Sequence, residues 1–582
     1  MATIQPKTSR GHKYWYIVES RRVNGKPRPV VLAYLGKAET LLKRLQGLTE
    51  KIKVKSYSHG AVAALLDVAQ KLDIPPIMNE YIESPRKYMA EKPIRNNLTA
   101  GITFLLGAIG RVCMPTSKRG WWNWAKTTSC EYLLRCSLSK IDSQHFWDLM
   151  DALPVDAIPK IESELLKRVQ KIYQVESDTL FFDTTNFFSY IDTTNTRCTI
   201  AQRGKNKQKR NDLRQIGLAL AVTKEHLIPL FHLTYKGNRN DTVVFKTIAS
   251  RLKDRILELG LQLSKHTLVF DRGNNSKKNM AILKELEFHY VGALTPYHHK
   301  KLIEDAESNF KSLSVGGTFL QGYRDKRTIW AEERTVVVYI SEKLKAGQLR
   351  GIYQSLRKKK KELQELQKSL SDPRGKIRNR LQLEEKIKTI VKGQYLKGII
   401  EWSVKEELEG KLTFDFDISM KKLTEVEDKL GFRILMTNRH AWSTEEIIKT
   451  YWGQCHIENA FKNLKNPYHL TLKPQFHWTD QKIIVHYFFC VLGFLLTTII
   501  WRQVKIKIGY KGCIDTLLDT LNNVRLAMLL EKSTTRGRLK AEYKLEEMSE
   551  EENMIMDALE IMRLHLDRPR LNGVGVYAEI RP

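Results

Sequence analysis

The chain has 582 residues, of which 42% are hydrophobic, so it can bury a large core and is expected to divide into several domains. Lys and Arg number 97 against 65 Asp and Glu, and the formal charge of +32 favours a polyanionic partner such as nucleic acid. Ribosomal, chaperone-like and membrane-surface proteins are also this basic, so charge alone does not identify the partner.

The cysteines and the apolar runs indicate the compartment. The seven cysteines are odd in number and form no C-x-x-C pair, which argues against a disulfide scaffold or a zinc module and favours a reducing compartment. Residues 1–13 contain no apolar signal region, and the longest apolar run, 487–501, has 15 residues where a membrane span needs roughly 20. We interpret this run as a buried core helix and expect a cytoplasmic, nucleoid-associated protein without a membrane segment.

The N-terminal third combines a β-unit with a helical region. Residues 13–35 alternate apolar and polar side chains around Asn24-Gly25, a pair typical of hairpin turns, so residues 1–57 are predicted to form a basic β-unit. Residues 58–175 are predicted to be helical and to bind DNA. Trp121, Trp122 and Trp124 stand beside several cations there, and this cluster fits a DNA surface or a core with a solvated rim equally well.

The next segment, residues 176–296, has the texture of an α/β domain. Short apolar runs predict strands at 179–182, 215–222, 227–235, 266–270 and 289–294, with helices at 241–260 and 276–286. Three strands in succession, then helix, strand, helix and strand, indicate a mixed sheet with flanking helices in RNase H-like order. We expect this segment to be the first part of a catalytic core.

The remaining chain is predicted to interrupt and then complete that core. Residues 297–430 are expected to form an inserted domain that contains a helical hairpin at 342–397, broken at 371–375. The second part of the core, 431–505, starts with a strand at 432–438 and a helix at 443–466, which Ser443 and Glu446 open as a capping box. Residues 506–582 are predicted to be a helical C-terminal region.

Two aspartates stand at the ends of predicted strands. Asp183 follows the apolar run 180–182, where a carboxylate is costly unless it is paired, hydrogen-bonded or bound to metal. Asp271 ends the strand at 266–270, and ligands bind at the carboxyl ends of strands in open α/β sheets. Each alone has a plain explanation as a turn cap or loop start. Together they indicate a two-ion phosphoryl-transfer site, because Mg²⁺ prefers carboxylate oxygens and the paired ions lie about 3.5 to 4 Å apart.

A third acid lies in the sequence YWGQCHIENAFKNLK. Tyr451, Gln454, Glu458 and Lys465 are spaced by three, four and seven residues, so one continuous helix would carry all four on one face. An exposed helix often carries Glu and Lys in this way, so the spacing by itself is weak support for function.

These motifs resemble the DDE transposases of bacterial and archaeal insertion sequences, the group with the Y-x2-R-x3-E-x6-K signature and an RNase H-like catalytic domain. The DTT at Asp183, the D-x-G at Asp271, and the segments GNRNDT at 237–242 and DRGNNSKKN at 271–279 resemble one subgroup. The resemblance covers roughly 180–500 and the N-terminal YIVESRRVNGKPRPVVLAYLG.

The resemblance implies roles for individual residues. Asp183, Asp271 and Glu458 would be the catalytic acids that bind two Mg²⁺ or Mn²⁺ ions. Tyr451 and Lys465 would contact DNA phosphates near the cleaved end. Gln454 stands where the family has arginine, and it keeps hydrogen-bond donors but lacks the fixed cationic fork.

The inserted domain of relatives helps to hold the transposon end and a flipped base. This implies that Trp330 is a candidate DNA-binding residue that stacks on such a base. An aromatic residue beside a strand is more often part of the core, so both interpretations stay open.

The resemblance further implies cut-and-paste transposition, in which metal-dependent cleavage and strand transfer proceed through a hairpin intermediate at the insertion-sequence ends. The partners would be double-stranded DNA, with its terminal inverted repeats and target, and a second copy of the chain in a synaptic homodimer. Two alternatives remain: a transposase-derived DNA-binding protein impaired by Gln454, and an RNase H-like nuclease without strand transfer. The 342–397 hairpin fits a dimerisation arm, a DNA clamp or a solvated face.

Overall fold

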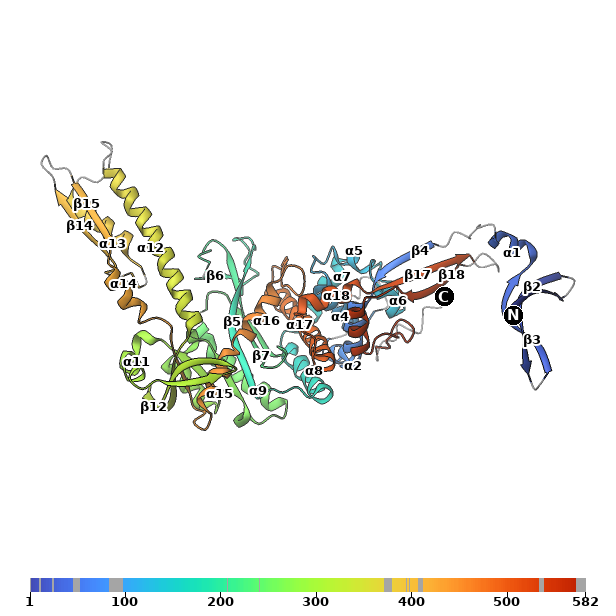
Figure 1. The fold of residues 1–582 in the computed structure, drawn as a ribbon, viewed down its shortest axis with the longest axis horizontal. Coiled ribbons are helices and arrows are strands. Elements are labelled where there is room, and N and C mark those ends of the chain that lie inside the picture. The colour runs from blue at the N-terminus through green and yellow to red at the C-terminus, as the bar shows by residue number, and fades with distance from the viewer. Residues whose placement is uncertain are drawn as a thin grey trace. The chain divides into compact units, whose positions relative to one another are not determined.

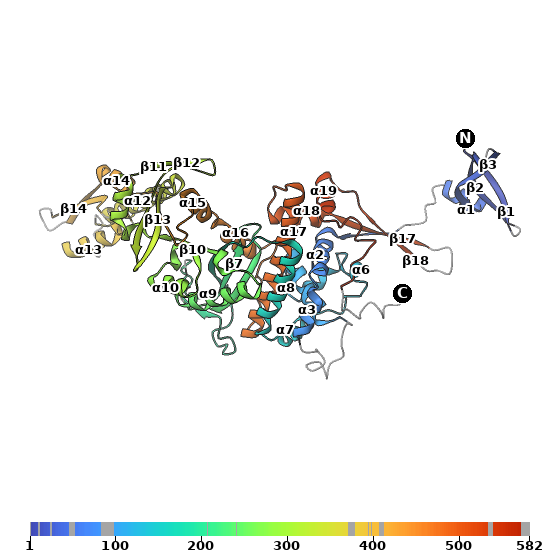
Figure 2. The same cartoon turned by 90° about the horizontal axis from the view of Figure 1, so that it is seen from below.

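The computed structural model describes the chain in two compact units, Leu153–Thr498 and Met1–Ala152 with Ile499–Pro582 (Figures 1 and 2). The described residues are 2–9, 12–23, 26–45, 53–82, 98–206, 208–239, 241–370, 379–393, 395–396, 398–406, 412–532 and 539–571.

The unit Leu153–Thr498 is built on a ten-stranded sheet whose centre has RNase H-like topology. Its central strands are β5 (Thr179–Ser189), β7 (Arg214–Thr223), β8 (Pro229–Lys236), β9 (Thr267–Phe270) and β10 (His289–Leu294). They lie in the spatial order β8-β7-β5-β9-β10, with β7 antiparallel to its neighbours and β9 and β10 parallel to β5. The predicted mixed sheet is therefore confirmed.

Helices cover this sheet because its strands present apolar side chains to both faces. On one face, Phe182 of β5 and Phe270 of β9 pack against Phe245 of α9 (Asp241–Glu258). Alternation along β5 turns Phe181 to the other face, where it meets His456 of α16 (Cys455–Lys465). α8 (Ala157–Tyr173), α10 (Lys277–Glu285), α11 (Lys300–Glu307) and the short β6 (Gln202–Arg203) complete this part of the unit.

The first part of the predicted insertion extends the same sheet. β11 (Lys311–Val315), β12 (Thr318–Ile329) and β13 (Glu332–Ile340) are antiparallel neighbours, and β13 pairs with β16 (Phe432–Thr437). β16 pairs in turn with β10, so the strand predicted at 432–438 does return the chain to the core sheet. Residues 311–340 therefore belong to the same sheet as β5, β9 and β10.

The second part of the predicted insertion forms a lobe with its own small core. α12 (Glu342–Leu370) and α13 (Arg380–Val391) confirm the two predicted helices, while the break predicted at 371–375 lies outside the described residues. The lobe also contains a hairpin, β14 (Ile400–Glu406) with β15 (Leu412–Ile418), and α14 (Met420–Glu427). Leu363, Leu383 and Phe414 are among the buried residues that join these elements, so the apolar faces of both helices are covered.

The single helix predicted at 443–466 is wrong, because the chain bends in the middle of the signature. α15 (Thr444–Trp452) ends before Gly453, and α16 begins at Cys455. Close packing explains the glycine at this interruption, since a Cβ on Gly453 would lie 2.3 Å from the Phe181 ring. The predicted start is confirmed, since the Ser443 side chain accepts a hydrogen bond from the Glu446 amide at 3.1 Å.

The second unit begins with a three-stranded antiparallel sheet of β1 (Ala2–Ser9), β2 (His12–Val23) and β3 (Lys26–Gly36), followed by α1 (Ala38–Leu45). The predicted Asn24-Gly25 turn between β2 and β3 lies outside the described residues. A helical part contains α2 (Gly60–Lys71), α3 (Ile74–Tyr81), α4 (Ala100–Cys113), α5 (Trp121–Ala125), α6 (Cys130–Leu134) and α7 (Ser143–Ala152). Trp121 and Trp124 are buried there, which favours the core interpretation of the tryptophan cluster.

The prediction of an entirely helical C-terminal region is also wrong. α18 (Ile514–Asn523) and α19 (Glu550–Ala558) are helices, but β17 (Arg525–Lys532) and β18 (Leu539–Leu545) form a hairpin between them. β17 also pairs with β4 (Lys53–Ser58), near the other end of the sequence. Leu, Ala, Lys and Glu favour helix locally, and this long-range pairing overrides that preference.

The apolar run at 487–501 lies within the helix α17 (Asp480–Ile508). Among the described residues this is the one helix that is long and apolar enough to cross a membrane by length and composition, and 94% of its most apolar window is buried inside the protein. The interpretation as a core helix agrees with that burial.

Candidate active site

Asp183 and Asp271 are neighbours on adjacent parallel strands. The β5–β9 register pairs Thr179 with Thr267 and continues to Phe182 with Phe270. The next residue in each chain segment is the aspartate, Asp183 within β5 and Asp271 directly after β9, so the two residues are neighbours on strands about 4.8 Å apart. The structure thus brings together the two acids that the sequence places 88 positions apart.

The two aspartates differ in their local settings. Asp271 is exposed, and its carboxylate accepts a hydrogen bond from the Arg272 amide at 2.7 Å, which caps the short helix Arg272–Asn274. Asp183 is half-buried within β5 and is paired across to Leu220 of β7. Asp271 is therefore held by its own backbone turn, and Asp183 by the sheet.

α16 covers the face of β5 that carries Asp183 (Figure 1). Side chains alternate along a strand, so Phe181, Asp183 and Thr185 share one face. The ring of Phe181 lies 5.4 Å from that of His456 at the start of α16, and Thr185 accepts a 2.6 Å hydrogen bond from Lys465 at its end. Asp183 lies between these two contacts and hence beneath α16.

Glu458 lies in the first turn of α16, between the same two contacts. Its side chain is exposed, and it shares a helical face with Lys465 because seven residues make almost two complete turns. The helix that carries the third acid is therefore placed over the strand that carries the first. Among the described residues, however, no three Asp, Glu, His or Cys side chains lie close enough together to hold a metal ion.

The donor chemistry of this site fits a hard divalent cation. Three carboxylates supply the oxygen ligands that Mg²⁺ and Mn²⁺ prefer, and two of them are fixed as strand neighbours. Glu458 stands on a separate helix, α16, and is not grouped with the aspartates as a three-ligand cluster among the described residues.

Tyr451 lies beside Asp271 at the end of α15. Its side chain is 4% exposed, and burial together with the negative charge of Asp271 raises the pKa of its hydroxyl well above the usual range. The hydroxyl oxygen is buried and has no hydrogen-bond partner among the described residues. The Arg433 guanidinium lies 5.8 Å from the ring centroid. In this conformation Tyr451 faces the acids, and a phosphate contact requires the ring to become exposed.

Gln454 and Lys465 differ in how firmly they are held. Gln454 is half-buried at the bend between α15 and α16, and it forms no side-chain cap on α16. Lys465 donates to Thr185, and its ammonium lies 5.3 Å from the Phe187 ring centroid and 5.9 Å from that of Phe461. Thr185 was not among the predicted site residues, although its position two residues after Asp183 places it on the same face of the strand.

Trp330 lies at the opposite edge of the sheet from the two aspartates. It forms a two-residue turn with Ala331 between β12 and β13, and both residues have positive φ. β13 starts at this turn and pairs through β16 with the first half of β10, whereas Asp271 follows the end of the parallel strand β9. The structure does not bring Trp330 to the acids. Its stacking on a flipped base stays a prediction, and it requires DNA that extends from one edge of the sheet to the other.

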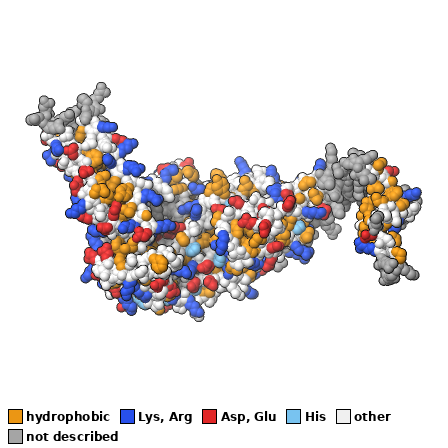
Figure 3. All heavy atoms as spheres, in the orientation of Figure 1, with side chains coloured by type: hydrophobic (Ala, Val, Ile, Leu, Met, Phe, Trp, Pro, Cys, Tyr) orange, Lys and Arg blue, Asp and Glu red, His pale blue; other side chains and the backbone are white. Residues whose placement is uncertain are grey.

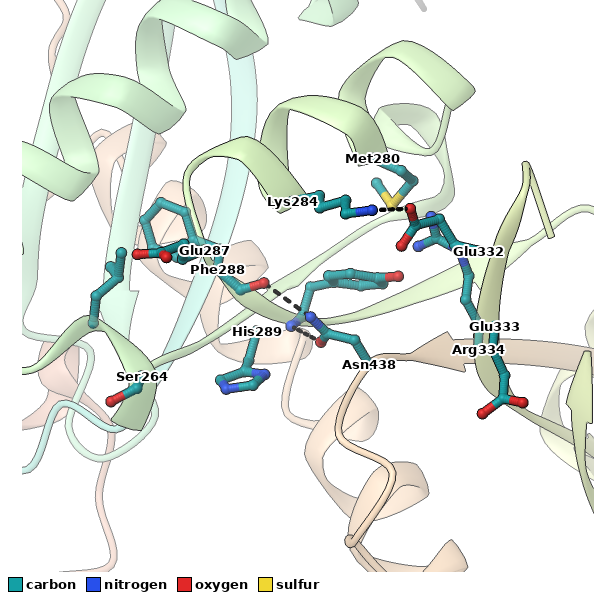
Figure 4. Close-up of a pocket in the computed structure, with 12 residues that line it drawn as sticks. Ser264, Met280, Lys284, Glu287, Phe288, His289, Glu332, Glu333, Arg334 and Asn438 are labelled. Atoms are coloured by element: carbon teal, nitrogen blue, oxygen red, sulfur yellow. Dashed lines mark hydrogen bonds and ion pairs between the residues drawn. The ribbon is translucent and has the colours of Figure 1, made fainter. Parts of the chain in front are cut away.

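A cavity of about 410 Å³ lies at the same edge as Trp330 (Figure 4). Lys284 and Glu332 face each other across it at 2.5 Å, and Arg334, at the rim, stacks on both Tyr290 and Trp330. Asn438 on its floor bonds the backbone of Phe288 and Tyr290, so its amide is used to join strands. None of the three acids lines this cavity.

Comparison with known proteins identifies related families. Residues 3–58 match the N-terminal domain of the IS1634 family transposases, and residues 188–474 match the transposase DDE domain. The second match includes Asp271 and Glu458, while Asp183 lies five residues before it. No curated protein matches the chain.

Among solved structures, the chain is similar to a cryo-EM structure of the piggyBac transposase synaptic complex with hairpin DNA. The two are 10% identical, the match covers 79% of this chain and 78% of that chain, and the TM-score is 0.37. This likeness is too low for any element to be placed by it.

Proposed function

The chain belongs to the DDE transposases of insertion sequences, and from this membership we propose that it cuts and rejoins DNA at the sheet edge formed by Asp183 and Asp271. The observation that carries the proposal is the β5–β9 register, which makes the two aspartates neighbours beneath the helix of Glu458. Carboxylates on neighbouring strands can supply the shared oxygen ligands that two-ion phosphoryl transfer uses.

In the proposed mechanism, Asp183, Asp271 and Glu458 would hold two divalent ions, Mg²⁺ or Mn²⁺, and the ions would supply activation of a water or a 3′-hydroxyl and stabilisation of the leaving oxygen. The sheet fixes the two aspartates, so the chain supplies their geometry before DNA arrives. Glu458 completes the ligand set from α16. Lys465, at the other end of α16, is placed to neutralise a phosphate next to the reacting one.

Tyr451 has a positioning role in this proposal. Its buried hydroxyl lies close to the carboxylate of Asp271, whose charge acts on it. An unpaired hydroxyl in that position is available to donate to Asp271 when the carboxylate turns toward an ion, which limits the orientations of the side chain.

We propose double-stranded DNA as the substrate, with cut-and-paste transfer of ends that carry terminal inverted repeats and a synaptic homodimer in which two sites act on paired ends. The charge of +32 supports a polyanionic substrate. Lys and Arg side chains are spread over the visible face of the described residues rather than gathered in one patch (Figure 3). Such a distribution suits contacts along an extended duplex.

The decisive experiment is a cleavage assay on a plasmid that carries the DNA flanking both ends of the gene. The wild-type protein is expected to release the ends with Mg²⁺ or Mn²⁺ and to be inactive in EDTA, and Asp183→Asn is expected to bind the ends without cutting. Asp178→Asn is the matched control. Asp178 is an exposed aspartate that directly precedes Thr179, the first residue of β5. Wild-type cleavage by Asp183→Asn would reject the assignment of this acid.

Two alternatives give different results in the same assay. A DNA-binding protein that no longer cuts, motivated by Gln454 in place of arginine, binds the ends but gives no product with either metal. An RNase H-like nuclease cuts, but it gives no strand transfer into a second plasmid and does not depend on the terminal repeats.

A further inference from the structure

Two exposed aromatic rings stand side by side in the segment that follows α16. Phe476 is 63% exposed and Trp478 is 43% exposed, while His477 between them is 3% exposed and packs on His486 at 4.4 Å. This alternation is typical of an extended backbone, so the two rings leave the same side of the segment about 7 Å apart. Large rings in water cost free energy, and a pair of them on one side indicates a surface that meets a ligand.

The pair is held firmly against the loop that continues β5. Asn195 donates its amide to the carbonyl of Trp478 at 3.3 Å. Asp480, two residues after Trp478, accepts from the amide and hydroxyl of Thr199 at 2.7 and 2.6 Å and from the amide of Ile200 at 2.9 Å. The aromatic segment and the loop therefore form one preorganised surface.

This surface is cationic. Residues 190–214 contain seven Lys and Arg against two Asp, so the loop as a whole attracts a polyanion. Arg197 of this loop stacks on the Trp478 ring, with its guanidinium carbon 5.4 Å from the ring centroid. A planar cation on an exposed indole leaves the other face of the ring free for a second planar group.

The surface is connected along the chain to the proposed catalytic elements. The loop leaves the end of β5 six residues after Asp183, and the aromatic segment follows Lys465 by eleven residues. The basic loop therefore continues the strand that carries Asp183, and the aromatic segment continues the chain after the helix that carries Glu458.

We propose that Phe476, Trp478 and Arg197 form a binding surface for unpaired nucleotides, with the bases stacked on the rings and the phosphates held by the basic loop. Exposed rings interleaved with cations are the arrangement by which proteins bind single strands without reading sequence. In a duplex the faces of the bases are stacked on one another, so a duplex would contact only the Lys and Arg side chains of this surface. This inference rests on the proposed function, since the unpaired nucleotides would come from strand cleavage by the same chain.

The test measures binding of the full chain in EDTA, where cleavage does not occur, to a short oligo-dT and to a duplex of equal length. Trp478→Ala is expected to weaken oligo-dT binding by about 5- to 100-fold, the effect of losing one stacked base, with little change on the duplex. Trp478→Phe keeps a stacking face and is expected to restore most of the affinity. Arg197→Ala is expected to weaken both ligands, because it removes a cation.

The matched control is Phe319→Ala. Phe319 is 80% exposed on β12, which is separated from β5 by four other strands of the sheet. An equal loss from Trp478→Ala and Phe319→Ala, or an equal loss on oligo-dT and duplex from Trp478→Ala, would overturn the proposal. A single strand with 2-aminopurine gives an independent readout, since stacking on Trp478 should quench its fluorescence in the wild type and not in Trp478→Ala.

The two proposals fail separately. If the wild type cleaves plasmid ends but Trp478→Ala binds oligo-dT normally, only the stacking surface is rejected. If Trp478→Ala loses oligo-dT binding while no cleavage is found with either metal, the surface stands and the catalytic proposal fails. Circular dichroism and melting of each variant show whether the fold is intact.

Discussion

The unit Leu153–Thr498 contains two groups of carboxylates that the fold uses in opposite ways. Glu162 of α8 lies between His232 and Arg255 with 12% of its side chain exposed, and its contacts with these two partners lower its pKa despite the opposing effect of burial. Arg255 also donates to the carbonyl of Pro159 at 2.8 Å, so this cluster joins α8, β8 and α9. Asp271 and Glu458 are exposed, and neither forms an ion pair with another described residue.

This contrast between paired and unpaired carboxylates indicates which acids are available to bind a ligand. A buried carboxylate whose charge is balanced by fixed cations contributes to the fold, and removing one partner leaves an uncompensated charge. An exposed carboxylate at a strand end costs the fold little and keeps its oxygens free for a ligand. The sheet thus carries structural acids beneath its helices and candidate catalytic acids at one edge.

The largest expected effect is on catalysis. Asp271→Asn and Glu458→Gln should each lower cleavage by at least about 1,000-fold, or about 4 kcal/mol of barrier, because each removes a charged ligand of the proposed ions. Neither variant should reduce stability, since both side chains are exposed. Glu446→Gln on α15, also exposed and outside the proposed site, is the control and should cut normally. Reduced melting temperature in parallel with lost activity would point to a structural role instead.

The second effect is on stability and concerns the other group of acids. Glu162→Ala should lower the free energy of unfolding of this unit by about 3–5 kcal/mol, because His232 and Arg255 then stay buried without their anion. Hydrogen exchange at α8 and β8 measures this locally, which suits a chain with two units.

Glu164→Ala is the matched control for this comparison. Glu164 lies on the same helix, but its ion pair with Lys167 is exposed, and such pairs contribute about 0–1 kcal/mol. Equal losses in the two variants would show that the buried cluster is not a special contributor.

The fold could be predicted in outline because its core strands contain short apolar runs that are flanked by polar residues. The apolar run before Asp271 does end where β9 ends, but the strand end predicted before Asp183 is wrong, because β5 continues to Ser189 through its pairing with β7. The strand order could be predicted from these runs, whereas the β5–β9 register that makes the two acids neighbours could not. The sequence therefore indicates the candidate acids but not the position of Glu458 relative to the two aspartates.

What could not be predicted depends on distant parts of the chain. The glycine where α15 ends is needed because Phe181, about 270 positions earlier, fills the space of a side chain at Gly453. β17 was predicted as helix because its residues favour helix, and only pairing with β4 makes it a strand. The place of Trp330 depends on a register that passes through three strands, so no local pattern could show on which edge it lies.

A third prediction contrasts the response of the two units to acid. His59, in the unit that contains the N-terminal residues, is buried beside Ser129, and burial lowers its pKa to about 3. The unfolded chain binds this proton near pH 6.5, so stability is complete above that pH and falls as the pH drops toward 3. At pH 5 the loss should reach about 2 kcal/mol. Glu162 has a lowered pKa instead, so its contribution is present above pH 4.5 and is lost only below that pH.

Hydrogen exchange between pH 7.5 and 5 separates the two responses once the intrinsic rates are corrected. Amides of α2 should lose protection, and those of α8 should keep it. His59→Gln removes the titrating group and should flatten the pH dependence of hydrogen-exchange protection at the α2 amides. The same pH dependence in His59→Gln and wild type would exclude His59 as its origin.

The smallest expected effect concerns Gln454, which stands at the position of the arginine in the signature of the resembling transposases. Gln454→Arg should add one phosphate contact, so the slope of log affinity against log salt should become steeper by about 0.9, and affinity at low salt should rise several-fold. Lys465→Ala should change the slope by about as much in the opposite direction. Because Gln454 is half-buried at the bend, an unchanged slope would mean that the side chain at this position does not reach the backbone of the DNA, and that Lys465 alone supplies the cation on this face.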